Sequence, residues 1–469
     1  METTQFYDSS DTICAISTAP GMGAIAVARL SGGDAFAIAD RIWQGASLSK
    51  ATTHTAHLGN IFDPESGEVI DQAVATVFRA PRSFSGDDTV EFAIHGSRWI
   101  QRRLISLLVK NGARLALPGE FTRRAFAAGK MDLAEAEAVA DIIASSSQAA
   151  HRLAISQMRG DFSRRLNALR DELIQLASLF ELELDFSEED VEFASRERLK
   201  QLADSLHTQL SRLAASFDAG AAIKDGIPVA IIGATNAGKS SLLNALLGDD
   251  RAIVSDIHGT TRDIVEDTVE LGPYLVRFKD TAGLRETDDT IENIGIERSR
   301  HAARTAGVVI FVIDPTEPPA PAALIDEIAG IDPRRLIFAI NKCDLNGSET
   351  PLPESLITNT ESRGSAIVRI SALTGEGLDA LRNTLQSIID ETVGNTESDI
   401  IVTNARHAEA LAAAAASAAA VSNGLAAAIP PDLVAQDLRE TIHHLSSITG
   451  QITAPDILQS IFSHFCIGK

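Results

Sequence analysis

Residues 233–241, GATNAGKSS, have the composition and spacing of a loop that binds phosphate groups. Gly233 ends an apolar run, four residues follow, and Gly238, Lys239 and Ser240 open a helical pattern. This is the G-x-x-x-x-G-K-[ST] motif in the strand–loop–helix context that it requires. Backbone amides and the helix N-terminus would face the phosphates, Lys239 would supply a positive charge, and the Ser240 hydroxyl would bind Mg²⁺. The loop therefore predicts a nucleoside triphosphate site.

Four motifs downstream of this loop follow the order found in guanine-nucleotide-binding proteins. GTTRD provides Thr261 as a second magnesium ligand, and DTAG provides Asp280 for magnesium and the Gly283 amide for the γ-phosphate. In NKCD, Asp344 can accept both N–H groups of a guanine edge, which adenine cannot offer. The SAL segment at 371–373 would complete the base pocket. Together the motifs predict GTP binding, with contacts from Gly233, Asn236, Ala237, Gly238, Lys239, Ser240, Ser241, Ser255, Asp256, Ile257, His258, Gly259, Thr260, Thr261, Asp280, Thr281, Ala282, Gly283, Asn341, Lys342, Asp344, Ser371, Ala372 and Leu373.

The usual water-orienting glutamine is missing, because DTAG is followed by Leu284. A carboxylate of the acid-rich segment 284–298 could position the attacking water instead. The amide oxygen of Asn236 could hold a monovalent cation where an arginine finger would otherwise point. Alternatively, Asn236 only shapes the loop, and the pattern leaves both interpretations open.

The N-terminal part, residues 1 to about 125, has the pattern of an α+β domain. Strands are predicted at 12–19 and 24–30, joined by PGMG, and at 70–79 and 89–95.

Arg29 has an unusual place in the second of these strands. It shares a strand face with Ile25 and Val27, because side chains alternate with a period of two. An arginine there either reaches water from the end of the strand or binds a ligand.

Helical periodicity begins at Met131. A first helix has on one face Leu133, Ala136, Ala140 and Ile143, and a longer helix has in register Leu166, Leu169, Leu173, Leu176 and Phe180. Residues 409–429, mostly alanine interrupted by Ser, Asn and Gly, indicate a helix–turn–helix in a bundle rather than a membrane span. Between these parts, 223–388 alternates strands and helices as a doubly wound α/β domain does. The simplest architecture inserts that domain into a helical bundle.

Composition limits the class of protein. The 469 residues exceed a single core, and the formal net charge is −23. This balance argues against broad nucleic-acid binding but allows a local basic patch or a basic partner. Cys14, Cys343 and Cys466 form no CxxC pair or zinc pattern, and the N-terminus lacks the layout of a signal peptide. We therefore expect a cytoplasmic protein.

Several blocks make the chain resemble the MnmE (TrmE) family of tRNA modification GTPases over essentially its whole length. They are DTICAISTAPGMGAIAVARLSG, SFSGDDTVEFAIHG, LPGEFTRRAFAAGKMDLAEAEAV, the GTPase motifs and the terminal FCIGK. Other GTPases share the central motifs, so the outer blocks make the match specific. The resemblance implies an N-terminal α+β tetrahydrofolate-binding and dimerisation domain at 1–126 and an α-helical domain at 127–222 and 390–469. A Ras-like α/β P-loop GTPase domain, 223–389, is inserted between the helical parts.

The resemblance also implies a pocket for a 5-formyltetrahydrofolate-type molecule. Its residues would be Arg29, Glu91, Lys130 and the terminal Lys469. Met22 in APGMG departs from the basic residue that many relatives carry, at a position of auxiliary folate or tRNA contact.

The C-terminal tail would belong to the same site. The last helix should dock, since it has at i, i+3, i+4 and i+7 the residues Leu458, Ile461, Phe462 and Phe465. Docking would bring the CIGK tail to a fixed place. Cys466 is then either a nucleophile in the modification chemistry or a buried thiol that only packs.

For the GTPase domain, the resemblance implies activation by potassium. Asn236, Ser255, Ile257 and Thr260 match the groups that hold the ion. Glu292 matches the carboxylate that orients the attacking water through a second water.

From the motifs and the resemblance together, we expect a homodimeric, potassium-activated GTPase that requires Mg²⁺. With an FAD-containing partner of the MnmG (GidA) type, it would install a carboxymethylaminomethyl or aminomethyl group at C5 of the wobble uridine of certain tRNAs. Folate would supply the one-carbon unit, and the tRNA would be held largely through the complex. The alternative is a regulatory or assembly GTPase of the ribosome-biogenesis type, without modification chemistry of its own.

Overall fold

The computed structural model describes most of the chain. The described residues are 11–185, 196–248, 267–278, 300–316, 328, 330–346, 364–393, 400–427, 429–452, 455–463, 465 and 468. They form two compact units. The first comprises 1–140, 157–167 and 446–469, and the second comprises 141–156 and 168–445.

The first unit contains a seven-stranded sheet with the order β3-β4-β5-β6-β2-β1-β7. Its strands are β1 (Ile13–Ile16), β2 (Ile25–Ser31), β3 (Trp43–Gln44), β4 (Thr55–Phe62), β5 (Val69–Phe78), β6 (Thr89–His95) and β7 (Arg114–Leu115). Neighbours pair antiparallel, except β1 and β7, which are parallel. The four predicted strands are confirmed, although the first is shorter than expected.

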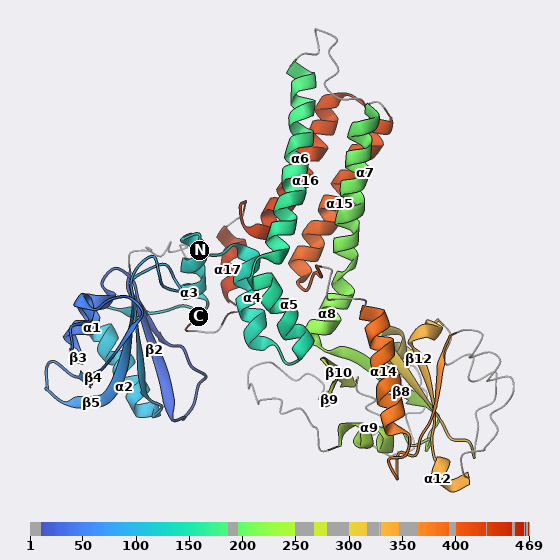
Figure 1. The fold of residues 1–469 in the computed structure, drawn as a ribbon, viewed down its shortest axis with the longest axis horizontal. Helices are drawn as coiled ribbons and strands as arrows, with labels where there is room; N and C mark the ends of the chain where they lie inside the picture. Colours follow the sequence, from blue (N-terminus) through green and yellow to red (C-terminus); the bar gives the residue numbers. More distant parts are fainter. Residues whose placement is uncertain are drawn as a thin grey trace, which may run out of the picture. The chain divides into compact units, whose positions relative to one another are not determined.

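Helices cover one face of this sheet. α1 (Ala35–Arg41) and α2 (Arg98–Lys110) pack on alternate residues of the strands, including Ala28, Ala75 and Phe92 (Figure 1). A short 3₁₀ helix, η1 (Leu48–Lys50), follows β3.

The other face of the sheet carries an apolar row. The strand register places side by side Val27, Ala93, Val74 and Leu58. These side chains point away from α1 and α2, because neighbouring residues of a strand face opposite sides. Leu58 is 69% exposed. We call these four residues the open sheet face.

The last helix, α17 (Pro455–Ser463), packs within the first unit. Phe462 and Phe465 are buried in one cluster with Leu133 and Ala136. The prediction that the last helix docks is therefore confirmed. The approach is close at α3 (Glu120–Ala127), because a Cβ on Gly119 would lie 2.7 Å from the backbone oxygen of Phe462.

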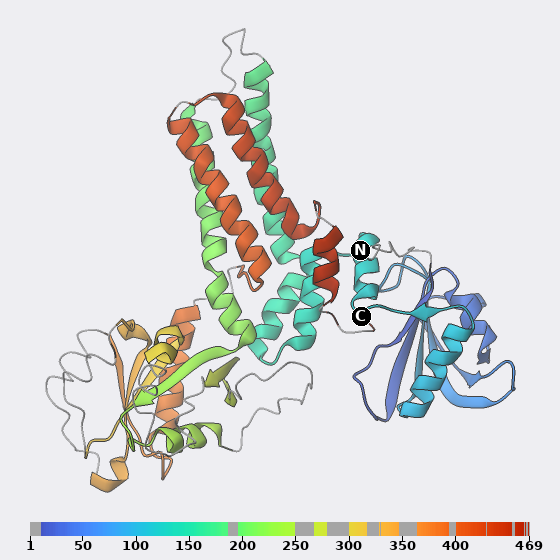
Figure 2. The same ribbon diagram turned by 180° about the vertical axis from the view of Figure 1, so that it is seen from behind.

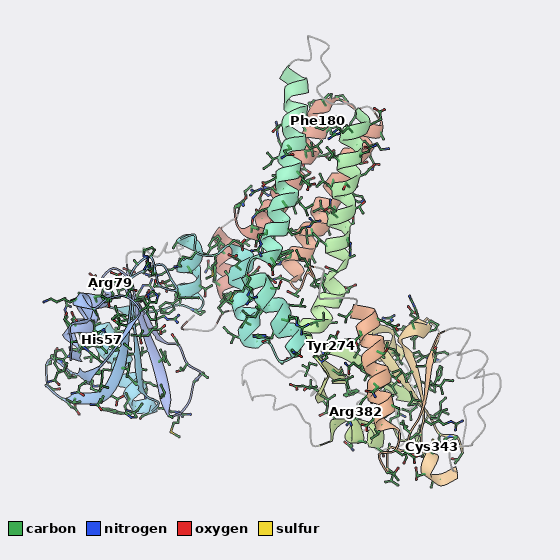
Figure 3. The ribbon with its side chains drawn as sticks, viewed as in Figure 1. His57, Arg79, Phe180, Tyr274, Cys343 and Arg382 are labelled. Carbon is green, nitrogen blue, oxygen red and sulfur yellow. The ribbon has the colours of Figure 1, made fainter. Side chains whose placement is uncertain are left out.

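The helical part follows the predicted periodicity. Its helices are α4 (Leu133–Ala144), α5 (Gln148–Met158), α6 (Asp161–Asp185), α7 (Arg196–Ala215), α8 (Phe217–Asp225), α15 (Ala405–Ala426) and α16 (Pro431–Thr449). Figure 2 shows α6, α7, α15 and α16 side by side. The stripe expected on the long helix is buried throughout, ending at Phe180, which Figure 3 labels.

Two helical predictions are wrong in detail. Ile143 is 48% exposed, because the cluster that covers Leu133 and Ala136 extends only to Ala140. The helix expected to end within 409–429 continues to Ala426 as α15, so the turn follows Ala426 and does not fall at Ser422, Asn423 or Gly424. Alanine has the highest helix propensity, and Gly424 serves close packing. A Cβ there would lie 2.6 Å from Cδ1 of Ile429.

The second unit contains the predicted α/β domain. Its sheet has the order β13-β12-β11-β8-β10-β9, and every neighbouring pair is parallel except β9 with β10. The elements are β8 (Ile227–Gly233), α9 (Lys239–Leu247), β9 (Asp267–Leu271), β10 (Tyr274–Phe278), β11 (Val308–Ile313), η2 (Pro333–Arg335), β12 (Leu336–Ile340), α12 (Cys343–Asn346), β13 (Ala366–Arg369) and α14 (Leu378–Val393).

The turn between β9 and β10 contacts a helix of the bundle. The Ala149 amide, in α5, donates to the Pro273 carbonyl at 2.9 Å. The next residue, Tyr274, donates its hydroxyl to Asp390 of α14 at 2.9 Å (Figure 3). The α/β domain and the bundle are thus joined by direct contact as well as by the chain. Among the helices that the structure describes, none is long and apolar enough to cross a membrane.

Candidate functional site

The phosphate-binding loop joins β8 to α9 as its motif predicts. Gly233 has φ +140°, and a Cβ there would collide with the Val312 carbonyl. Gly238 has φ +96°, and a Cβ there would collide with Nδ2 of Asn341. Both positions therefore require glycine. Asn236 also has a left-handed backbone, with φ +64°.

Lys239 and Ser240 open the helix that follows. The Lys239 ammonium lies across the loop, 2.8 Å from the Gly233 carbonyl and 2.7 Å from that of Ala234. Both residues lie in the first turn of α9, where the backbone amides favour an anion. The site therefore presents a positive charge and helix amides to the same ligand, as a triphosphate requires.

The base pocket is joined to this loop by Asn341. Its Nδ2 donates to the Ala237 carbonyl at 2.9 Å, and its Oδ1 accepts from the Ala372 amide at 2.9 Å. Ser371 donates its hydroxyl to Oδ1 of Asp344 at 2.6 Å. Three of the predicted motifs thus form one network, which fixes the Asp344 carboxylate. Cys343, labelled in Figure 3, is the first residue of α12 and directly precedes Asp344.

One residue of this pocket escaped the sequence reading. Asp314 follows β11 and accepts from the Lys342 ammonium at 2.6 Å. Lys342 has φ +62°, which fixes its direction relative to the loop. Burial raises the pKa of Asp314, but hydrogen bonds from Lys342 and Thr316 outweigh this, and the pKa is lowered. The sequence feature that could have identified Asp314 is its place directly after the apolar run 308–313.

Part of the predicted site lies outside the described residues. These are Ser255, Asp256, Ile257, His258, Gly259, Thr260, Thr261, Asp280, Thr281, Ala282, Gly283, Glu292, Cys466 and Lys469. Leu373 is described and is largely exposed, as is Ser241.

A second group of candidate residues gathers around Arg29. Its Nη2 lies 2.8 Å from the Glu91 carboxylate, and the register places the two residues opposite each other on β2 and β6. The guanidinium carbon lies 5.2 Å from the ring centre of Phe84 and 5.4 Å from that of Phe121. Only 15% of the Arg29 side chain is exposed. The structure thus brings Arg29 and Glu91 together, and two aromatic rings that the sequence reading missed complete the cluster.

Lys130 and the C-terminal tail border the same region. The Lys130 ammonium donates to the Pro81 carbonyl at 2.6 Å, on the loop that also carries Phe84. The carbonyl of Gly468 accepts from the Ser17 hydroxyl at 2.9 Å. Ser17 directly follows β1, the strand that pairs with β2. The tail therefore reaches the edge of the Arg29 cluster.

Two family descriptions match this chain. Residues 12–130 match "GTP-binding protein TrmE N-terminus", and residues 133–466 match "MnmE helical domain". Together with the phosphate loop and the guanine pocket, these matches define a P-loop GTPase domain set within a helical domain and preceded by a TrmE-type domain.

Full-length relatives identify the family. A tRNA modification GTPase MnmE of Parabacteroides distasonis is 51% identical over 98% of this chain and 100% of its own length. Those of Porphyromonas gingivalis, at 49%, and Cytophaga hutchinsonii, at 44%, cover 98% and 100% of this chain. The chain belongs to the MnmE family of tRNA modification GTPases.

Solved structures of GTP-binding proteins match part of this chain. Aquifex aeolicus Era bound to GDP·AlF₄⁻ is 30% identical over 40% of this chain and 66% of that chain, with a TM-score of 0.28. The G domain of the T. maritima FeoB iron transporter is 23% identical over 34% of this chain and 98% of that chain, with a TM-score of 0.26.

Proposed function

We propose that the chain is a potassium-activated GTPase that controls modification of C5 of the wobble uridine in certain tRNAs, together with an FAD-dependent MnmG-type partner. Relatives that carry the name tRNA modification GTPase match it from end to end, and this observation carries the proposal. Folate would supply the one-carbon unit, and the flavin of the partner would supply the redox chemistry. A regulatory switch that lacks the outer domains does not account for matches on both sides of the GTPase domain.

The residues around the nucleotide have separate tasks in this proposal. Asp344, held by Ser371, accepts the N–H groups of guanine, while the loop amides and Lys239 bind the phosphates. Ser240, with Thr261, provides the oxygen ligands that Mg²⁺ prefers. Glu292 positions the attacking water, because Leu284 has no polar group for this role.

Potassium would be held where Asn236 turns its backbone. The left-handed conformation at φ +64° is uncommon for a residue other than glycine, which supports a special role at this position. Ser255, Ile257 and Thr260 would provide the remaining oxygen ligands. A cation there places positive charge beside the phosphates, as an arginine finger does in other GTPases.

GTP turnover of the purified protein in KCl, against NaCl at equal ionic strength, tests this function. We expect strong stimulation by potassium and its loss in Asn236→Ala at unchanged affinity for GDP. Equal turnover in the two salts would overturn the cation mechanism and leave GTP binding intact.

The Arg29 cluster fits a folate. A pterin ring is flat and carries N–H groups on one edge, so a carboxylate such as Glu91 can accept them while aromatic rings such as Phe84 contact its face. Lys130 and Lys469 would bind the negatively charged end of the molecule. The fit is supported by the grouping of a charged arginine, a carboxylate and two aromatic rings, which can contact both the edge and the face of a flat ligand.

Calorimetric titration with 5-formyltetrahydrofolate tests this site. Arg29→Ala should weaken binding by at least tenfold, since it removes a charge-assisted contact of about 1.5–3 kcal/mol. Unfolding of the N-terminal domain should be followed in parallel. Unchanged folate affinity would return Arg29 to a structural role.

A further inference from the structure

Helix α2 is strongly basic in an acidic protein. Its sequence, RWIQRRLISLLVK, contains no acidic residue, whereas the chain as a whole has a net charge of −23. The buried side of the helix is apolar, with Leu104, Leu107 and Leu108 in the sheet core. Its basic residues therefore lie on the outer side of the N-terminal domain.

Two of these basic residues already have acid partners. Arg103 lies 2.5 Å from Asp63, and Lys110 pairs with Glu65. Asp71, at the start of β5, is bound by the amide and the imidazole of His95 at 2.8 and 2.7 Å. These acids are thus engaged by other groups.

Arg98 and Arg102 remain. They stand one helical turn apart, and both are exposed. Within the described parts of the chain, neither is within ion-pair distance of an acid. Nε of Arg102 donates a hydrogen bond to the Arg98 carbonyl at 3.3 Å. Two neighbouring guanidinium groups without a carboxylate fit an anionic partner with repeated charges.

An exposed aromatic residue, Trp99, follows Arg98 on the same helix. Trp99 is 52% exposed at the first turn of α2, where Ser97 caps the helix. The turn that contains Met22, 82% exposed, lies beside it. The Gly23 amide donates to the Gly96 carbonyl at 3.2 Å, the Gly96 amide donates to the Ala24 carbonyl at 3.2 Å, and Gln101 donates to the Gly21 carbonyl at 3.1 Å.

These bonds tie the start of α2, which carries Trp99, to the turn that contains Met22. An exposed ring on the same helix turn as two arginines can stack with a base while the arginines bind flanking phosphates. Carboxylates of a protein or phosphates of RNA could pair with these arginines, and the tRNA substrate of the proposed function favours RNA.

We infer that Arg98, Trp99 and Arg102, the α2 basic surface, contact the RNA of the tRNA substrate at an unpaired loop. The inference rests on the proposed function, which supplies the RNA. The surface lies on the helix-covered side of the sheet, opposite the open sheet face, so a second copy on the open sheet face leaves it accessible. Because the α2 basic surface makes only two phosphate contacts, it binds the tRNA weakly, and the FAD-dependent partner contributes most of the tRNA affinity.

Fluorescence anisotropy with a labelled anticodon stem–loop RNA tests the surface, using the full chain at a series of KCl concentrations. The double variant R98A/R102A should bind roughly tenfold more weakly at low salt, and the slope of log affinity against log salt should fall by about 1.5. Trp99→Ala should weaken binding roughly tenfold at an unchanged slope. Lys110→Ala, on the same helix and paired with Glu65, is the matched control and should bind as the wild type does.

Three outcomes would overturn the inference. The first is no RNA binding by the wild type at low salt, and the second is equal RNA binding by the wild type and the double variant. The third is that the double variant loses association with the FAD-dependent partner but still binds RNA. Denaturant unfolding of the N-terminal domain reports whether each variant is folded. An assay of wobble-uridine modification with the partner distinguishes failure of the proposed function from failure of this inference. No modification by the wild type would refute the proposed function. Modification at wild-type rates by the double variant would refute only the role of the α2 basic surface.

Discussion

Single charges determine how well the guanine pocket is ordered. The Lys342 side chain leaves a left-handed backbone position and ends on the Asp314 carboxylate at 2.6 Å. Because the NKCD motif needs its lysine and aspartate in fixed places, Asp314 is a positioning residue for the base site.

Asp314→Asn should weaken GDP binding about tenfold, since it removes a charge-assisted hydrogen bond. Turnover at saturating GTP should not change, because Asp314 lies at the base pocket. Mant-GDP titration measures the affinity. In a double-mutant cycle with Lys342→Met the two losses should not add, and additive losses would show that Asp314 acts independently of Lys342.

A buried carboxylate orders the segment between the sheet and α4. Glu120 is 1% exposed and lies 2.6 Å from Arg114 and 3.2 Å from Arg124. Burial raises its pKa, but hydrogen bonds from Arg114 and the Leu117 amide outweigh burial, so that the pKa is lowered.

Glu120→Gln should lower the free energy of unfolding of the N-terminal domain by about 3 kcal/mol, since two arginines lose a buried partner. A lowered pKa gives stability that is complete above the unfolded-state value and lost as the pH falls. The wild type should therefore lose stability from about pH 5 downward, and this part of the loss should be absent in the variant. Denaturant unfolding at several pH values measures both. Glu65→Gln, at an exposed pair, should change little.

At the scale of elements, docking of α17 determines where the C-terminal tail lies. Phe462 and Phe465 pack with Leu133 and Ala136, and the Gly468 carbonyl then meets Ser17. Among the described residues, the tail contributes the bond between Gly468 and Ser17, whereas Phe462 of α17 and Phe465 just beyond it bury two aromatic rings. Of these contacts, the aromatic packing contributes more free energy than the hydrogen bond.

Phe462→Ala should destabilise this docking by about 3 kcal/mol, the usual cost of emptying a buried aromatic site. Hydrogen exchange should increase within 446–469 and remain unchanged in the GTPase domain. Exchange at wild-type rates in the tail would show that its position does not depend on α17. Ile457→Ala, at an exposed position of the same helix, is the control.

At the scale of the whole molecule, we propose that a second copy binds at the open sheet face. Val27, Ala93, Val74 and Leu58 form an apolar row on a sheet whose other face is covered by α1 and α2. Covering such a row removes apolar side chains from water, which favours association. Homodimerisation, implied by the resemblance, would cover it.

Leu58→Asp should convert the dimer to a monomer, because it would place a charge in an apolar interface. Light scattering coupled to size-exclusion chromatography measures the mass. Leu202→Asp introduces the same charge at an exposed leucine of α7 and should leave the mass unchanged. A dimer of undiminished stability in Leu58→Asp would place the interface elsewhere.

The sequence by itself determined those features that depend on neighbouring residues. The phosphate loop, four of the seven strands of the first sheet and the stripe from Leu166 to Phe180 follow from spacing and period, because one element fixes which of its own residues share a face. Strands β3, β4 and β7 were not predicted. The insertion of an α/β domain into helices follows from the order of these patterns.

The tertiary structure alone decided contacts between distant segments. The hydrogen bond between Ser17 and Gly468 joins residues 451 apart in the sequence. Lys342 pairs with Asp314, which follows the neighbouring strand β11. It also decided that Arg29 lies between Phe84 and Phe121, and that Gly424 lies within a continuous helix. The reason is physical. Period and propensity act within one element, whereas these contacts depend on which elements pack together and on the side chains that meet where they do.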